Sequence, residues 1–83
     1  MAVHFHPHAR ERMDKRNATE DEVKATIEQG EEFPAKFGRT GFRRNFQFTG
    51  ERRGKLYKIK QIEACAVKEE GNWLVLTVIT RYF

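Results

Sequence analysis

Residues 73–80 read Trp-Leu-Val-Leu-Thr-Val-Ile-Thr, and this stretch decides the expected fold. In an extended chain, one side would carry Trp73, Val75 and Ile79, and the other Leu74, Leu76 and Val78. β-branched residues dominate, and the run contains neither glycine nor proline. Such a run is typical of a strand that is covered on both faces. We therefore expect an inner strand of a sheet, which would hold Arg81 and Tyr82 on a rigid support.

Two helices are expected before the sheet. Pro7 suits a first helical position because its missing N–H would be unpaired there anyway, and Asn17 suits a left-handed stop after a helix over about residues 7–16. The segment Thr19-Glu20-Asp21-Glu22 has the capping-box pattern that begins a helix. Gly30 is the natural end of this second helix.

The rest of the chain alternates as strands do. Residues 33–37 predict a short edge strand, 42–48 a half-buried strand, and 56–67 a long strand with a bulge or bend near residues 60–61. Residues 1–5 are either a short strand or a frayed end. The order predicts one α+β domain over residues 1–83, with two N-terminal helices packed on one face of a three- to four-stranded antiparallel sheet.

Composition narrows the class of protein. A chain of 83 residues can bury one modest core, and the single Cys65 excludes an intramolecular disulfide framework. We expect no membrane partner, because no apolar stretch reaches spanning length and no signal-peptide layout is present. The expectation is a soluble, cytoplasmic protein, either a monomer or a homodimer.

Charge is distributed unevenly along the chain. Residues 20–32 hold six acids and one base, whereas residues 36–60 hold nine bases and one acid. Such asymmetry favours a polyanion or an acidic protein as partner. A well-solvated outer face of the sheet would show the same pattern.

The candidate catalytic residues begin with His8, Arg12 and Arg16. Their i, i+4, i+8 spacing places them along one edge of the first helix. Histidine is the natural proton-transfer group near neutral pH, and arginine forks bind phosphate oxygens. These groups could cleave RNA without a metal. The alternative is ordinary packing, with the arginines paired to Glu11, Glu20 or Glu63.

Arg81 and Tyr82 extend this candidate site. Arg81 could hold phosphate, and Tyr82 could stack a base or act as an acid. Arg43, Lys58 and Lys60 are candidate nucleic-acid contacts on the sheet. The alternatives are a C-terminal aromatic anchor and solvated lysines. His4, His6 and His8 alternate, but no cysteine or carboxylate lies nearby at a familiar metal spacing, so neither a metal nor a cofactor is expected.

The first helix also carries a resemblance. The segment His8-Ala9-Arg10-Glu11-Arg12-Met13-Asp14-Lys15-Arg16, followed by Thr19 and Val23, resembles the opening H-A-x-x-R-M-x-x-R-x-x-(S/T)-x-x-x-V of a family of short prokaryotic proteins known only as a domain of unknown function. Val75-Leu76-Thr77-Val78 resembles that family's final V-x-T-V strand. The family is similar in layout to RelE/ParE-like toxins and to barnase-, colicin- and RelE-type ribonucleases. The resemblance implies that His8 and Arg12 are the first positions to test.

The leading hypothesis is a toxin-like, metal-independent endoribonuclease. His8 would be the acid or base, Arg12, Arg16 and Arg81 would hold the scissile phosphate, and the bases of the sheet would follow the RNA backbone. Two alternatives stay open. One is a non-catalytic module that binds nucleic acid, and the other is an interaction domain that docks an acidic partner such as an antitoxin.

Overall fold

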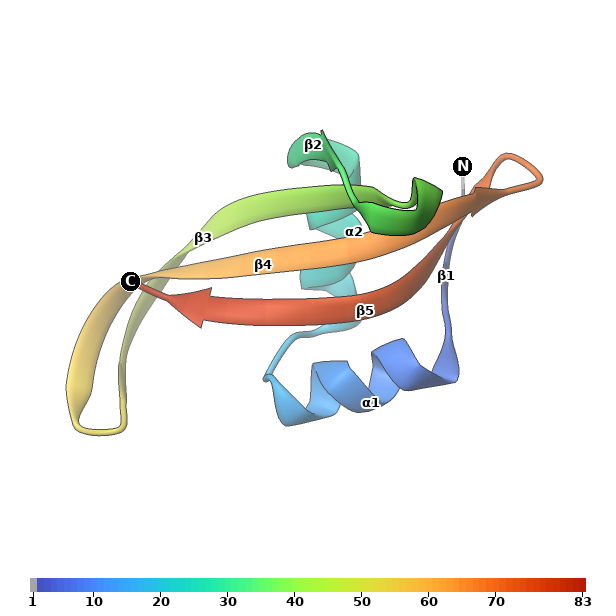
Figure 1. Ribbon diagram of the computed structural model, residues 1–83. Coiled ribbons are helices and arrows are strands. Elements are labelled where there is room, and N and C mark those ends of the chain that lie inside the picture. The colour runs from blue at the N-terminus through green and yellow to red at the C-terminus, as the bar shows by residue number, and fades with distance from the viewer. Residues whose placement is uncertain (1) are drawn as a thin grey trace.

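The computed structural model describes residues 2–83 and contains two helices and five strands (Figure 1). The elements are β1 (Val3–Phe5), α1 (Pro7–Lys15), α2 (Glu20–Gln29), β2 (Glu31–Pro34), a 3₁₀ turn η1 (Lys36–Gly38), β3 (Thr40–Arg52), β4 (Lys55–Glu69) and β5 (Asn72–Tyr82). The α+β class is confirmed. Met1, part of the stretch where a strand was one expectation, lies outside the described residues.

The sheet differs from the prediction of three or four antiparallel strands. Its order is β1-β5-β4-β3-β2, and β1 pairs parallel with β5 while the other pairs are antiparallel. The prediction was wrong because β1 has only three residues, and so short a strand gives no readable alternation in the sequence.

β5 is an inner strand, as expected, because β1 and β4 flank it. Its two faces, however, are not both covered. Cys65 pairs with Thr77 and Ala66 with Val75, so Leu76 is an extra residue in a β-bulge. The bulge turns Val75 and Val78 to the same side, where both are fully buried. Leu74, Leu76 and Ile79 are only partly buried.

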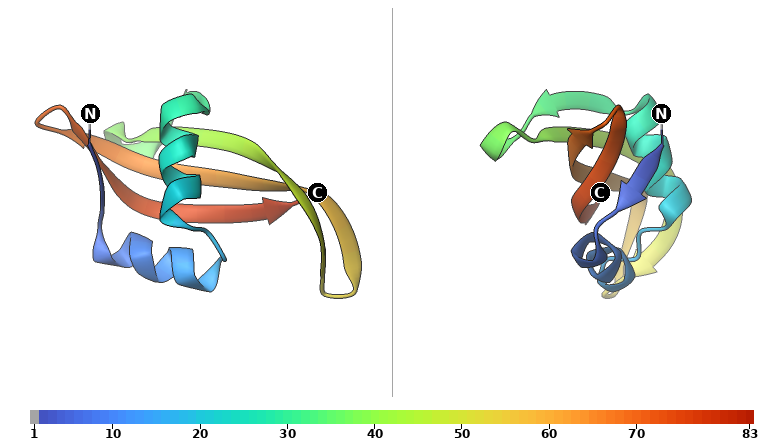
Figure 2. Two further views of the ribbon diagram at one scale, coloured as in Figure 1. Left: turned by 180° about the vertical axis from the view of Figure 1, so that it is seen from behind. Right: turned by 90° about the vertical axis from the view of Figure 1, so that its right-hand side faces the viewer.

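One hydrophobic cluster joins the helices to the sheet. α1 packs mainly against β5, and α2 lies across β3 and β4 (Figure 2). We call the side of the sheet that contributes to this cluster the core side, and we call the opposite side the outer side. The cluster contains Ala9, Met13, Ala18, Val23, Ile27, Phe42, Ile62, Ala64, Ala66, Val75 and Val78.

The helix ends follow the sequence signals. Thr19 and Glu22 form the capping box in both directions, with bonds of 2.9 and 3.1 Å. Asn17 has a φ of 55°, the left-handed conformation expected after α1. Within residues 2–83, neither helix has the length and apolar character needed to cross a membrane.

The β3–β4 hairpin extends past the rest of the sheet and bends toward the side where α1 lies (Figures 1 and 2). A register shift between Gln47 and Gly50 marks a bulge in β3, which accounts for the bend. At the tip, Arg52 pairs with Lys55, so Arg53-Gly54 forms a two-residue loop. Their φ values of 54° and 76° are those of a type I′ turn. The bend brings this turn toward the end of α1.

Candidate functional site

A hollow of about 340 Å³ lies between the end of α1, the β3–β4 hairpin and the end of β5. We call it the basic hollow. Of the described residues that line it, four are cationic and none is acidic. Its lining consists of Lys15, Arg16, Arg52, Arg53, Tyr57, Thr80 and Tyr82. Such a concave, positive surface concentrates anions near it.

Arg16 is fixed to the edge of β5. β1 pairs only with residues 73–75, so the edge of β5 beyond them is open to side chains. The Arg16 guanidinium donates a hydrogen bond of 2.8 Å to the carbonyl oxygen of Val78. This bond uses one end of the guanidinium and leaves its other N–H groups for a ligand.

Aromatic rings form one wall of the basic hollow. The Tyr82 ring packs against Phe48 and Tyr57, with centroids 5.0 and 5.9 Å away. The guanidinium of Arg52 stacks over the Tyr82 ring at 4.6 Å from its centroid. An aromatic face can hold a guanidinium in place while the N–H groups, which point outward in the plane of the guanidinium itself, stay available for a ligand. Tyr82 is therefore a packed wall residue rather than a free stacking platform.

Two hydroxyl groups in this wall have no partner. Thr80 Oγ1 and Tyr82 Oη are buried and make no hydrogen bond to any described residue. A buried polar group without a partner costs about 1–3 kcal/mol. Because both side chains line the basic hollow, a ligand oxygen bound there is the natural acceptor for their protons.

His8 and Arg12 lie on the same edge of α1 as Arg16, but outside the hollow. The Arg12 Nε atom donates to His8 Nε2 at 3.3 Å, so the neutral imidazole carries its proton on Nδ1. The side chain of His8 is exposed, and its backbone N–H donates to His6 Nδ1 at 3.1 Å. At about 1.5 Å of rise per residue, His8 and Arg12 lie roughly 12 and 6 Å from Arg16 along the axis.

Arg81 and Arg43 lie on the outer side of the sheet. Arg81 pairs with Glu63 at 3.2 Å, and Arg43 pairs with Glu31 at 2.9 Å. Neighbouring residues of a strand point to opposite faces, so Arg81 points away from the core side that carries Tyr82. The structure does not bring Arg81 together with His8 or Arg12.

Lys60 is occupied in the interior, contrary to the expectation of a surface base. It is 7% exposed, and its ammonium contacts Glu22 Oε1 at 3.0 Å and the carbonyl oxygen of Asn17. These bonds connect β4 to α2 and use the ammonium group, so Lys60 is not available as a nucleic-acid contact. Lys58 lies two residues earlier on β4 and is exposed.

Sequence reasoning missed most of the basic hollow. Lys15, Arg52, Arg53, Tyr57 and Thr80 were not among the candidates. The Arg52-Arg53-Gly54 sequence lies between two predicted strands, and two adjacent arginines before a glycine at such a connection are a signal that could have been used. The position of that turn near the end of α1 depends on the bulge in β3, which the sequence did not reveal.

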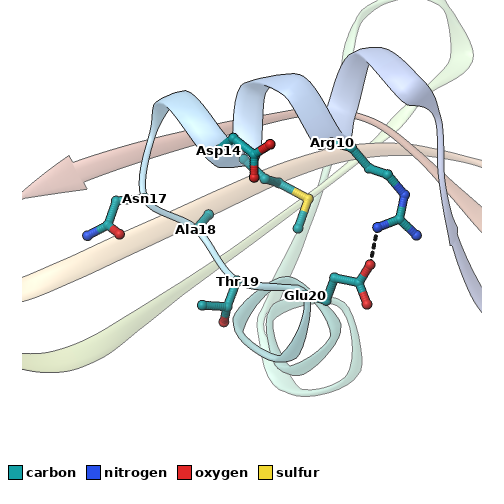
Figure 3. A pocket seen from close by; sticks show the side chains of 7 residues that line it. Arg10, Asp14, Asn17, Ala18, Thr19 and Glu20 are labelled. Atoms are coloured by element: carbon teal, nitrogen blue, oxygen red, sulfur yellow. Dashed lines mark hydrogen bonds and ion pairs between the residues drawn. The ribbon is translucent and has the colours of Figure 1, made fainter.

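Two other hollows are less suited to an anion. One, of about 420 Å³, lies between α1 and the start of α2 (Figure 3). Arg10 is paired there with Glu20, and Asp14 adds a second carboxylate. The other, of about 580 Å³, is lined by Glu69 and Glu70 together with His4, Asn72, Trp73 and Leu74. Carboxylates in both repel a polyanion.

Comparisons of the chain with protein-family models, with curated proteins and with solved structures found no match in any of the three.

Proposed function

We propose that the protein binds single-stranded RNA along α1 and in the basic hollow. The observation that carries this proposal is the set of four cations that surrounds the basic hollow without an acidic residue among the described lining. Phosphate oxygens are preferred acceptors for arginine forks.

The edge of α1 continues the basic surface away from the basic hollow. His8, Arg12 and Arg16 repeat every four residues, which is about 6 Å along a helix. Successive phosphates of an extended strand can each meet one of these side chains while one end of the strand occupies the basic hollow. A rigid duplex presents its phosphates on a convex surface, which fits a hollow between a helix and a bent hairpin less well.

The test is RNA binding by fluorescence anisotropy over a salt series. Arg53→Gln should weaken binding and reduce the slope of log affinity against log salt by about 0.7, the value for one phosphate contact on a single strand. The matched control is Arg39→Gln, which removes the same charge from an exposed side chain near η1. Equal affinities and slopes for the two variants would contradict the proposal.

A second function, cleavage of the bound RNA, is favoured by the pairing of His8 with Arg12. The Nε2 lone pair of neutral His8 accepts the Arg12 Nε–H at 3.3 Å, and when Arg12 turns to the phosphate this lone pair can take the proton of a ribose 2′-OH. The 2′-oxygen then bonds to phosphorus, the bond to the 5′-oxygen breaks, and that oxygen takes a proton from the imidazolium or from water. Arg12 stabilises the charge that develops on the phosphorane oxygens.

Cleavage is tested with labelled RNA in the presence of a chelator. His8→Gln should lower the single-turnover rate by about a hundredfold or more, as expected when a general acid–base group is removed. His4→Gln is the control, because His4 is also an exposed histidine and lies on β1. Products should end in a 2′,3′-cyclic phosphate and a 5′-hydroxyl. Equal rates for His8→Gln and the parent protein would leave binding as the only function.

We also infer a distant relationship to RelE/ParE-like toxins, in which the two helices pack on one face of the sheet and an acidic antitoxin docks on the basic surface in the cytoplasm. What supports this inference is the His8, Arg12 and Arg16 spacing and the order of two helices followed by the antiparallel strands β2–β5. Co-expression with the product of an adjacent reading frame tests it. Loss of RNA binding in the complex is the expected result.

A further inference from the structure

We propose that the basic hollow receives a phosphate monoester at an end of the RNA, rather than a diester within the strand. This inference rests on the proposed RNA binding and specifies which part of the RNA enters the basic hollow. The first argument is charge. A monoester carries about −1.5 to −2 at pH 7, whereas each diester carries a single charge. The four cations of the basic hollow, with no acid among the described lining residues, match the more highly charged group.

The second argument is the number of hydrogen-bond donors. The hydroxyls of Thr80 and Tyr82 have no partner among residues 2–83, and Arg16, Arg52 and Arg53 add guanidinium forks. A monoester presents three terminal oxygens, one more than the two non-bridging oxygens of a diester. A monoester therefore pairs more of these donors.

The third argument is how the basic hollow is built. α1, the hairpin and β5 close it on three sides, and its volume of about 340 Å³ is at the small end of ligand pockets. A terminal phosphate with its nucleoside fills such a space, and the strand leaves along α1. Arg52 lies over the Tyr82 ring, so its guanidinium is the group that shifts to give the phosphate access to the hydroxyls.

The experiment compares three RNAs of one sequence, with a 5′-phosphate, a 3′-phosphate or hydroxyls at both ends. Anisotropy with the full chain should show about a tenfold or greater preference for one phosphorylated RNA, since one or two charge-assisted hydrogen bonds account for such a factor. The RNA that binds more tightly shows whether the basic hollow receives a 5′-phosphate or a 3′-phosphate.

The hydroxyl groups are tested by the double variant Thr80→Val, Tyr82→Phe. The preference for the phosphorylated RNA should fall to less than about threefold, because each lost bond to a charged group contributes strongly. Binding of the RNA without a terminal phosphate should weaken much less than binding of the phosphorylated RNA. The control is Thr77→Val, which removes a hydroxyl from the outer side of β5. A thermal melt of the double variant checks that it is folded.

The outcomes separate the two proposals. Equal affinity for all three RNAs would overturn the monoester site and leave RNA binding in place. Failure of all three to bind would overturn the RNA proposal, and titration with nucleoside 5′- and 3′-monophosphates, followed by NMR of the Tyr82 ring, would then test the basic hollow alone. Absence of a shift at millimolar concentration would overturn the monoester site.

Discussion

Glu22 and Lys60 form an ion pair between α2 and β4, with the carboxylate oxygen 3.0 Å from the ammonium nitrogen. The same carboxylate accepts the backbone N–H of Thr19 at 2.9 Å and so completes the capping box. Lys60 also donates to the carbonyl oxygen of Asn17, in the turn between the helices. One buried lysine thus fixes the turn and the second helix to the sheet.

Disruption of this pair should destabilise the fold. Glu22→Gln leaves the buried ammonium without its counter-charge and should lower the free energy of unfolding by about 3 kcal/mol. Lys60→Met keeps the aliphatic stem and should cost about 1–3 kcal/mol through the unpaired polar groups. Urea denaturation measures both. The double variant should lose less than the sum of the two, and strict additivity would show that the pair is not coupled.

Removal of an unpaired hydroxyl should not destabilise the protein. Thr80→Val and Tyr82→Phe each delete a buried group that has no partner among the described residues. Each should leave the free energy of unfolding unchanged or raise it by up to about 1 kcal/mol. A loss above about 1 kcal/mol for either variant would mean that the hydroxyl has a partner in solution, such as an ordered water.

Replacement of Arg53 should raise the stability of the protein and weaken its binding of RNA. Its φ of 54° is left-handed, a conformation that asparagine adopts more easily than arginine. Arg53→Asn should therefore raise the free energy of unfolding by about 0.5–1 kcal/mol and weaken RNA binding several-fold through the lost phosphate contact. Thermal unfolding and anisotropy measure the two effects.

The chain supplies a matched control for this variant. Glu70 has a φ of 49° and precedes Gly71 in the β4–β5 turn, as Arg53 precedes Gly54 in the β3–β4 turn. Glu70→Asn should stabilise the protein to a similar extent without weakening RNA binding. If both variants weaken binding equally, the effect of Arg53 is not local to the basic hollow.

Glu11 should moderate the binding of RNA. Its carboxylate pairs with Lys15 at 2.9 Å, and the hydrogen bond and positive charge of Lys15 lower the pKa of Glu11. Glu11 is therefore ionised at neutral pH and partly neutralises one cation of the basic hollow. Glu11→Gln should tighten RNA binding about two- to threefold at low salt and less at high salt, since exposed charges act weakly and are screened by ions.

The control for Glu11→Gln is Asp14→Asn, which changes the same charge on α1 at a residue that lines the hollow between α1 and the start of α2.

The pair of Glu11 with Lys15 also makes the stability of the protein depend on pH with a defined sign. Because the pKa of Glu11 is lowered in the folded protein, the stabilisation from its pair with Lys15 is present at neutral pH and is lost as the pH falls through that lowered pKa. Glu11→Gln should remove this part of the acid dependence.

Local patterns in the sequence predicted the elements that depend on local chemistry. The α+β class, the capping box at Thr19, the left-handed stop at Asn17 and the inner strand after residue 72 are all present. Close to the bulge or bend expected near residues 60–61, the backbone N–H groups of Lys58 and Ile59 both donate to the carbonyl oxygen of Phe83, which is the pattern of a β-bulge. Tyr57 packs against Tyr82 and Lys60 pairs with Glu22, so an odd-numbered and an even-numbered residue of β4 share the core side on the two sides of this bulge.

The composition of the site depends on a single extra residue. Without the bulge at Leu76, residues 75, 77, 79 and 81 would share one side of β5, and Arg81 would face the core side with Val75. The bulge exchanges the two faces, so Tyr82 joins the basic hollow and Arg81 pairs with Glu63 on the outer side. Nothing in an apolar run such as residues 73–80 marks where a bulge falls.

The pairing of β1 with β5 also affects how the protein is made. Val3 lies opposite Trp73, and the backbone N–H of Ala2 reaches Asn72, seventy positions further along the chain. Closing so long a loop has an entropic cost and slows folding. During synthesis, the first strand must wait without a partner until the last strand has left the ribosome, and the edge of the sheet beside α1, where Arg16 is fixed, assembles only after translation reaches that point.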